Sequence, residues 1–290
     1  MSIRLSKFIN KIFIIIFLFT IPFPVFSEEK KIDFIKIDWS FDGIFGTFDR
    51  ASLQRGYQVY AEVCSGCHSV QHLSYRNLSE KGGPEFSVEE AKIIASQFEI
   101  EDGPNSDGEM FLRPARLSDN FVKPYPNVEA STAANGGAYP PDMSVLAKAR
   151  AGGADYIYSL LLGYEEAPAG LELDEGVYYN KYMPGQKIKM SEPISDGIVD
   201  YSDGTAASKE QISKDITAFL VWASEPHLES QHRMGFKSIF YLIILITLVY
   251  LSKKKVWARF SSSSKEEEET FDKVEKAVTE YEGEDPKTFK

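Results

Sequence analysis

The chain has 290 residues, of which 43% are hydrophobic and 13% aromatic, enough apolar material for one sizeable globular core. It has only two cysteines, which excludes a scaffold of several disulfides and any cluster that takes four thiolates from this chain. Lysine and arginine number 32 against 43 acidic residues, a net charge of −11. This charge argues against a nucleic-acid-binding protein, because neutralising phosphates requires a basic face.

The N-terminus has the pattern of a secretory signal. Basic residues precede the apolar run from Ile12 to Ile21, and the small residue Ser27 before Glu28 is typical of a signal-peptidase site. We interpret residues 1–27 as a removed signal peptide, with an uncleaved signal anchor as the alternative. Both interpretations place the residues that follow outside the cytoplasm.

A second apolar segment, near the C-terminus, is interpreted as a membrane anchor over residues 233–257. Its uncharged stretch, 238–252, spans about 22 Å as a helix against a hydrocarbon core of about 30 Å. Lys237 and Lys253 can extend it by directing their alkyl chains outward. The alternative is a buried core helix. Lysines at 253–255 follow the span, so the positive-inside rule places the C-terminus in the cytoplasm.

The charge is unevenly distributed along the chain. Residues 28–232, the expected exported domain, contain 18 basic and 33 acidic residues, a net charge of −15. Such a domain favours encounter with a basic partner, although ordinary solubility would also explain the excess of acid. The tail, 258–290, includes four consecutive glutamates at 266–269. We expect it to be a disordered cytoplasmic segment with one short helix at most.

The exported domain shows helical periodicity, no internal repeat and no strong alternating pattern typical of strands. A helix after an N-cap at Asp49 should carry Cys64 near its C-terminal end. Further helices are expected at residues 87–98, 142–151, 155–162 and from 208 to the proline at 226. The long stretches 103–141 and 168–205 are expected to be irregular. Loops of this length are uncommon in a compact domain unless a cofactor organises them.

The segment Cys64-Ser-Gly-Cys67-His68 has the spacing of a covalent haem c site. Two cysteines three residues apart can reach the two vinyl groups on one edge of a porphyrin, and the adjacent imidazole can bind the iron as the fifth ligand. The alternatives are a disulfide between the two cysteines, and a zinc site that adds His72.

The other histidines are poor candidates for the sixth iron ligand, because His72 is too close to His68 to reach the other haem face and His227 and His232 stand just before the membrane span. A methionine is the better candidate, and a His/Met pair gives a relatively high reduction potential. The candidates in the exported domain are Met110, Met143, Met183 and Met190, with Met234 at the membrane edge. Met183 and Met190 flank a Pro-Gly turn, which makes this loop the leading place. The spacing alone does not choose between the two.

Several motifs together resemble the cytochrome c1 family, the haem subunits of cytochrome bc1 complexes. They are W-S-F-D-G-I-F-G-T-F-D at 39–49, V-C-S-G-C-H at 63–68, K-P-Y-P-N at 123–127, G-A-Y-P-P-D at 137–142, A-R-A-G-G at 149–153 and P-G-Q-K-I-K-M at 184–190. The resemblance runs from about residue 38 to residue 257. It implies a mainly α, cytochrome c-like haem domain with long irregular loops and one C-terminal transmembrane helix.

The resemblance also implies roles for individual residues. Cys64 and Cys67 would attach the haem, His68 and Met190 would bind its iron, and Arg150 would hold a haem propionate. Pro140 and Pro141 would line the haem.

The implied function is one-electron transfer within a quinol:cytochrome c oxidoreductase. Electrons would come from a Rieske iron–sulfur protein and leave to a cytochrome c, with cytochrome b in the same complex. The implied location is a bacterial inner membrane, with the haem domain in the periplasm. The alternatives are a free-standing, membrane-anchored c-type cytochrome, and a non-haem structural protein with a Cys64–Cys67 disulfide or a zinc site.

Overall fold

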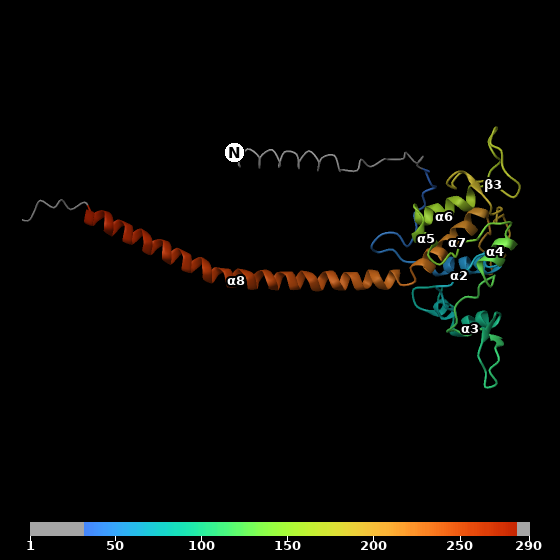
Figure 1. Cartoon of the computed structure of the whole chain (residues 1–290), viewed down its shortest axis with the longest axis horizontal. Helices are drawn as coiled ribbons and strands as arrows, with labels where there is room; N and C mark the ends of the chain where they lie inside the picture. The colour runs from blue at the N-terminus through green and yellow to red at the C-terminus, as the bar shows by residue number, and fades with distance from the viewer. Residues whose placement is uncertain (1–31, 283–290) are drawn as a thin grey trace, which may run out of the picture. The chain divides into compact units, whose positions relative to one another are not determined.

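The computed structural model describes residues 32–282, so the expected signal peptide at 1–27 lies outside the described residues. The described chain is mainly α-helical, which confirms the expected fold class (Figure 1). Its helices are α2 (Arg50–Val59), α3 (Val88–Ser96), α4 (Val128–Ala134), α5 (Leu146–Ala149), α6 (Gly153–Leu162), α7 (Lys209–Ser224) and α8 (Leu228–Glu282). Two short antiparallel hairpins pair β1 (Glu99–Asp102) with β2 (Phe111–Pro114) and β3 (Tyr178–Tyr179) with β4 (Lys187–Ile188).

Helix α2 begins where its N-cap predicts. The Asp49 carboxylate accepts a hydrogen bond from the Ala51 N–H at 3.0 Å. The helix continues as a π-helical turn, Tyr60–Cys64, in which the Ser65 N–H donates to the Tyr60 carbonyl at 2.8 Å. Such a wider turn is common at functional sites, and here it sets the direction in which Cys64 leaves the helix.

Helices α2 and α7 lie side by side in the middle of the domain (Figure 1). They approach so closely that a Cβ on Gly56 would lie 2.2 Å from the Asp215 carbonyl oxygen. Buried aromatic rings pack around this contact, with Tyr60 stacked on Phe219 at a centroid distance of 5.7 Å. The close approach explains why this position of the sequence is a glycine.

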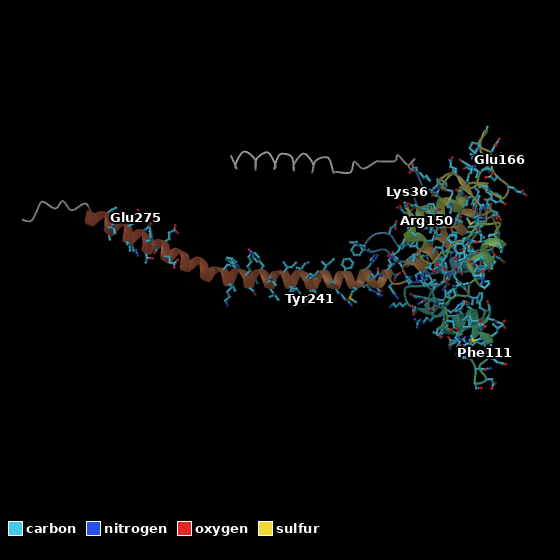
Figure 2. The ribbon with its side chains drawn as sticks, in the orientation of Figure 1. Lys36, Phe111, Arg150, Glu166, Tyr241 and Glu275 are labelled. Atoms are coloured by element: carbon cyan, nitrogen blue, oxygen red, sulfur yellow. The ribbon has the colours of Figure 1, made fainter. Side chains whose placement is uncertain are left out.

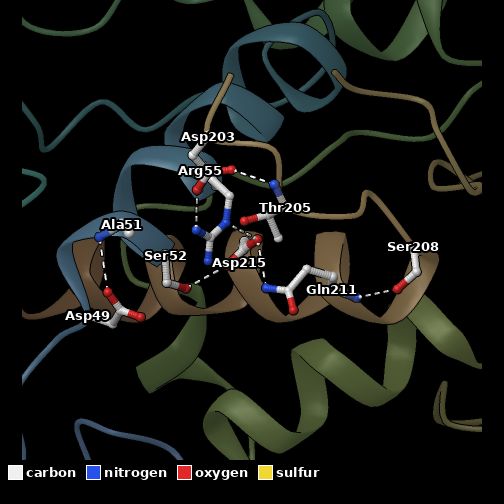
Figure 3. A network of polar contacts seen from close by, with 9 residues as sticks. All are labelled: Asp49, Ala51, Ser52, Arg55, Asp203, Thr205, Ser208, Gln211 and Asp215. Carbon is white, nitrogen blue, oxygen red and sulfur yellow. Dashed lines mark hydrogen bonds and ion pairs between the residues drawn. The ribbon is translucent and has the colours of Figure 1, made fainter. Parts of the chain in front are cut away.

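A buried polar network joins the same two helices (Figure 3). The Asp215 carboxylate is fully buried and accepts hydrogen bonds from Ser52 Oγ at 2.7 Å, Arg55 Nε at 2.9 Å and Gln211 Nε2 at 3.0 Å. Arg55 also pairs with Asp203, whose side chain is 41% exposed. The network therefore provides a buried charge with the partners that it needs.

The secondary structure between residues 103 and 151 differs from our expectation in two places. Helix α4 and strand β2 lie in a stretch expected to be irregular, and the helix expected at 142–151 is reduced to α5. The Asp142 carboxylate accepts a hydrogen bond from the Ser144 N–H at 2.9 Å. This local turn takes the place of the first helical turn, because a short acidic side chain can cap its own backbone.

Within residues 32–282, one helical segment is long and apolar enough to cross a membrane, Leu228–Ala258 in α8. Its large apolar side chains between 239 and 251 are 40–67% exposed, as expected for a surface that faces lipid. The helix continues to Glu282, where we expected a disordered tail. No proline interrupts residues 228–282, and the lysine, glutamate and alanine of the tail favour helix.

The network around Asp215 gives a first prediction. Asp215→Ala should lower the free energy of unfolding by about 3–5 kcal/mol, because it leaves the mostly buried Arg55 guanidinium without its main partner. Asp203→Ala is the matched control, since it removes the exposed carboxylate from the same arginine and should change stability little. Denaturant unfolding of the full chain in detergent, followed by circular dichroism, measures both. Equal losses in the two variants would contradict this account.

Candidate functional site

The C-S-G-C-H segment forms a compact turn at the end of the π-helical turn that follows α2. The Cys67 and His68 N–H groups both donate to the Cys64 carbonyl, at 3.1 and 2.9 Å. Both cysteines carry free thiols, so the structure does not support the disulfide alternative. Burial raises the pKa of Cys64 to about 12, whereas Cys67 is exposed. The two thiols are therefore presented on one turn, one partly buried and one exposed.

The orientation of His68 is fixed by the main chain of a distant loop. Its Nδ1 lies 2.8 Å from the Pro141 carbonyl oxygen. Because a carbonyl only accepts hydrogen bonds, Nδ1 carries the hydrogen and Nε2 keeps its lone pair. Burial lowers the pKa of His68, against the opposing effects of the Pro141 hydrogen bond and of Asp142. The neutral imidazole is the form that binds a metal ion.

The loop that holds His68 is itself tied to the residues after the motif. The Asp142 carboxylate accepts hydrogen bonds from Ser69 Oγ at 2.7 Å and the Gln71 N–H at 3.0 Å, and the Met143 N–H donates to the Ser69 carbonyl at 2.8 Å. Partial burial would raise the pKa of Asp142, but these hydrogen bonds and those from Ser144 hold it below its usual value. We did not predict this role, although a Pro-Asp-x-Ser turn directly after Pro140 is a visible signal for it.

Met190 lies after strand β4 and is half-buried. The Tyr164 hydroxyl donates to the Met190 carbonyl at 3.1 Å, and Lys189 Nζ donates to the Gly136 carbonyl at 3.3 Å. The segment that begins at Gly136 reaches the carbonyl that holds His68 five residues later, so at most about 18 Å of chain separates the two contacts. One loop thus borders both of the expected iron ligands.

The other methionine of this loop, Met183, has a different environment. Its sulfur lies 3.8 Å from the Tyr156 hydroxyl, which donates a hydrogen bond to it from helix α6. Met183 therefore has a structural partner of its own. This contact favours Met190 as the ligand, a choice that the residue spacing alone left open.

Of the remaining expected site residues, Pro141 contacts the motif turn directly, and no hydrogen bond or ion pair joins Arg150 or Pro140 to that turn among the described residues. Arg150 is the exposed C-cap of α5, and one of its terminal guanidinium nitrogens donates to the Ala149 carbonyl at 3.3 Å (Figure 2). Pro140 is half-buried beside Pro141. The structure thus joins His68 directly to Pro141 and leaves the guanidinium of Arg150 mostly available to a ligand.

The residues around the motif suit a large apolar group. A cavity of about 160 Å³ next to the motif turn is lined by Ser65 and by the rings of Tyr60, Tyr75, Phe98 and Phe121. In the described part of the chain, no three histidine, cysteine or acidic side chains gather as metal ligands, so the zinc alternative has no ligand set there. Free thiols, an oriented imidazole and an aromatic wall together fit a covalently attached haem.

Residues 39–260 match the Cytochrome C1 family. The chain belongs to the cytochrome c1 family. Among its relatives, cytochrome b/c1 of Bradyrhizobium diazoefficiens is 49% identical over 239 residues, which cover 76% of this chain and 35% of that longer protein. The mitochondrial heme protein cytochrome c1-2 of Solanum tuberosum is 46% identical over 236 residues, 81% of this chain and 90% of the relative. Cytochrome c1 of Rhodospirillum rubrum is 42% identical over 247 residues, 80% and 90% of the two chains.

Cytochrome c1 is the electron-transferring haem subunit of the cytochrome bc1 complex, an oxidoreductase, and membership of the family implies covalent haem c in this chain. This result excludes the free-standing cytochrome and the non-haem structural protein as accounts of the sequence. It also agrees with the one membrane-spanning helix found in residues 32–282, which places the protein in a membrane. The match ends at residue 260, so the helical tail lies beyond the family's common part.

The hydrogen bonds that join Asp142 to Ser69 and Gln71, which we call the Asp142 clamp, give a second prediction. Asp142→Ala should lower the free energy of unfolding by about 1–2 kcal/mol, because three hydrogen bonds to a half-buried carboxylate are lost. It should also alter the visible spectrum of the haem-loaded cytochrome c1, because His68 loses the support of its loop. Asp200→Ala removes an exposed carboxylate outside the clamp and is the control. An unchanged spectrum in Asp142→Ala would show that the loop does not orient His68.

Proposed function

We propose that Cys64 and Cys67 form the two thioether bonds to haem and that His68 and Met190 bind its iron. The protein would accept electrons from a Rieske iron–sulfur protein and pass them to a cytochrome c. The observation that carries the proposal is the hydrogen bond from His68 Nδ1 to the Pro141 carbonyl at 2.8 Å. It leaves Nε2 as the only ring nitrogen with a lone pair available to iron.

The haem, when bound, supplies an iron that takes up one electron and releases one electron. The residues of the chain do the positioning. Pro141 holds the imidazole of His68 in one tautomer, so electron transfer need not involve a change in the protonation of that ring. The Met190 thioether favours the reduced iron and so gives a relatively high potential. Tyr164 keeps the Met190 backbone in place through its hydroxyl.

Arg150, Pro140 and Pro141 complete the proposed haem environment. Most of the guanidinium N–H groups of Arg150 have no partner among the described residues, and a guanidinium matches a carboxylate such as a haem propionate in a bidentate manner. The rings of the two prolines lie next to the carbonyl that holds His68. We therefore assign them to the wall of the haem pocket.

The proposed partners agree with the charge of the domain. Residues 28–232 carry a net charge of −15. In the loop between α6 and β3, the acidic side chains are all exposed; they are Glu165, Glu166, Glu172, Asp174 and Glu175. Figure 2 labels Glu166 among them. An acidic surface attracts a basic soluble protein and speeds its association at low salt. The electron acceptor is thus proposed to be a cytochrome c with a basic face.

The proposed location is a bacterial inner membrane, with the haem domain in the periplasm and the C-terminus in the cytoplasm. Its support is the lysine cluster at 253–255 at the end of the membrane-spanning segment, together with the signal-like N-terminus. Cytochrome b and the Rieske protein would lie in the same complex.

The haem attachment can be tested on the mature chain produced in its native host. Mass spectrometry should show one covalently added haem, and single Cys64→Ser and Cys67→Ser variants should each lose at least one of the two thioether bonds. A native chain without added haem would overturn the proposal, whatever the behaviour of the variants.

The choice of the sixth ligand gives a separate prediction. Met190→Leu should leave haem attached and lower its reduction potential by on the order of 0.1 V or more, because axial ligands set haem potentials over about 0.8 V. Met183→Leu is the matched control, with a potential close to that of the original protein. Redox titration with optical spectra measures both variants. If Met183→Leu changes the spectrum and Met190→Leu does not, the ligand assignment is wrong.

A further inference from the structure

A cavity of about 400 Å³ opens where the first turns of α8 meet the loop before α2 and the segment between α5 and α6. Its lining includes Trp39, Phe41, Asp42, Lys148, Glu225 and His232. This volume falls in the range of small-molecule sites, roughly 300–1,000 Å³. None of these residues belongs to the proposed haem site.

The position of α8 in a membrane gives the level of this cavity. The uncharged stretch 238–252 is shorter than the hydrocarbon core by about 8 Å, so the core should extend about 4 Å beyond each end. That places its boundary near Phe236. His232 lies one turn further out, at about 6 Å, within a headgroup layer that is about 5–8 Å thick on each side. His232, on the wall of the cavity nearest the membrane span, therefore lies at the level of lipid headgroups.

The loop that forms one wall of the cavity also reaches the membrane boundary. The ring of Phe45 stacks on that of Phe236 with a centroid distance of 5.2 Å and an interplanar angle of 19°. Ile44 and Phe45 are 65% and 77% exposed. Two large apolar side chains at this level are suited to the acyl boundary of a bilayer.

Most charges that line the cavity are already paired. Lys148 Nζ lies 2.6 Å from a Glu225 carboxylate oxygen, and Asp155 accepts a hydrogen bond from Lys36 Nζ at 2.8 Å. Asp42 is the exception, since in the described part of the chain no donor or cation contacts its carboxylate. The side chain of Asp42 is exposed, and slight burial together with the nearby charges of Asp155 and Asp38 raises its pKa. Asp42 and Asp155 both line the cavity, so this part of its wall is acidic and attracts a cation.

A second polar group in the cavity also has no partner. His232 Nδ1 is buried and makes no hydrogen bond with any described residue. An unpaired buried nitrogen is costly, and a ligand atom that bonds to it recovers that cost. The cavity thus offers one site for a cation and one for a hydrogen-bonding anion, next to an apolar surface.

We propose that this cavity binds the headgroup of an ethanolamine phospholipid from the leaflet on the side of the haem domain. The ammonium group pairs with Asp42, the phosphate accepts a hydrogen bond from His232, and the acyl chains lie along Ile44, Phe45 and Phe236. An ethanolamine headgroup fits better than the common alternatives. Choline has no N–H to donate, and a glycerol headgroup brings a negative charge without a cation that could pair with Asp42. The proposal is independent of the haem ligands.

The test uses the full, haem-loaded chain in dodecyl maltoside, titrated separately with dioleoyl phosphatidylethanolamine, phosphatidylcholine and phosphatidylglycerol. Native mass spectrometry gives the occupancy of each lipid. We expect phosphatidylethanolamine to bind about tenfold more tightly than phosphatidylglycerol, the effect of one charge-assisted pair. Equal binding of the three lipids would overturn the proposal.

Variants of residues that line the cavity test whether phosphatidylethanolamine binds there. Asp42→Asn should weaken the binding of phosphatidylethanolamine about tenfold, and His232→Ala should weaken it independently. Asp107→Asn removes the same charge from the exposed β1–β2 hairpin and should leave binding unchanged. If Asp42→Asn and His232→Ala both bind like the original chain, the lipid binds elsewhere and the proposal fails.

Two further samples separate the possible occupants. Water-soluble phosphoethanolamine, which lacks acyl chains, should bind much more weakly than the lipid; equal affinity would rule out the contribution of Ile44 and Phe45. The cytochrome bc1 complex purified from native membranes should retain phosphatidylethanolamine on this subunit, and the Asp42→Asn complex should lose it. A complex with no such lipid would show that another subunit covers the cavity.

Discussion

The close contact between α2 and α7 is the constraint on which the rest of the domain depends. At Gly56 the two backbones touch, and the fully buried Asp215 binds Arg55, which directly precedes Gly56, and Ser52, one turn earlier. Apolar packing alone would let two helices slide by a fraction of a turn at modest cost. A buried carboxylate that needs several donors permits one register, because any shift leaves a charge unpaired. The turn that carries Cys64 therefore starts from a fixed helix.

From that helix, the proposed iron site is built largely by main-chain contacts. The His68 imidazole is held by a carbonyl group, and the residues after it pair with the backbone and the carboxylate of Asp142. A main-chain carbonyl cannot be removed by a point substitution, so a substitution can weaken the contact to His68 only by moving the loop, for example through Asp142. The half that carries Met190 is different. It is held by the hydroxyl of Tyr164 and the ammonium of Lys189, which are side-chain contacts that a single substitution can abolish.

The sequence predicted the parts of this structure that depend on local rules. Caps and helical periodicity located α2, α3, α6 and α7, and the fixed spacing of Cys64, Cys67 and His68 indicated haem chemistry. Contacts between distant segments were not visible in the same way. Neither the pairing of His68 with Pro141 nor that of Arg55 with Asp215 follows from periodicity, because each joins residues 73 or 160 positions apart. Strands of two to four residues carry too little alternation to be recognised. In the tail, the charge of the sequence suggested disorder, but α8 continues to Glu282. The helix propensity of its residues agrees with that helix.

The same helix that carries the motif is also tied to the membrane helix. Arg50, the first residue of α2, pairs with Glu229 in the first turn of α8 at 2.8 Å, and the Phe48 N–H donates to the same carboxylate at 3.0 Å. From Arg50 to Cys64 the helix spans at most about 21 Å. Arg50, at the start of α2, is bonded to α8, and the helix leads from Arg50 to Cys64. A part-buried ion pair and one helix thus limit the distance between the membrane-spanning helix and the proposed haem attachment point.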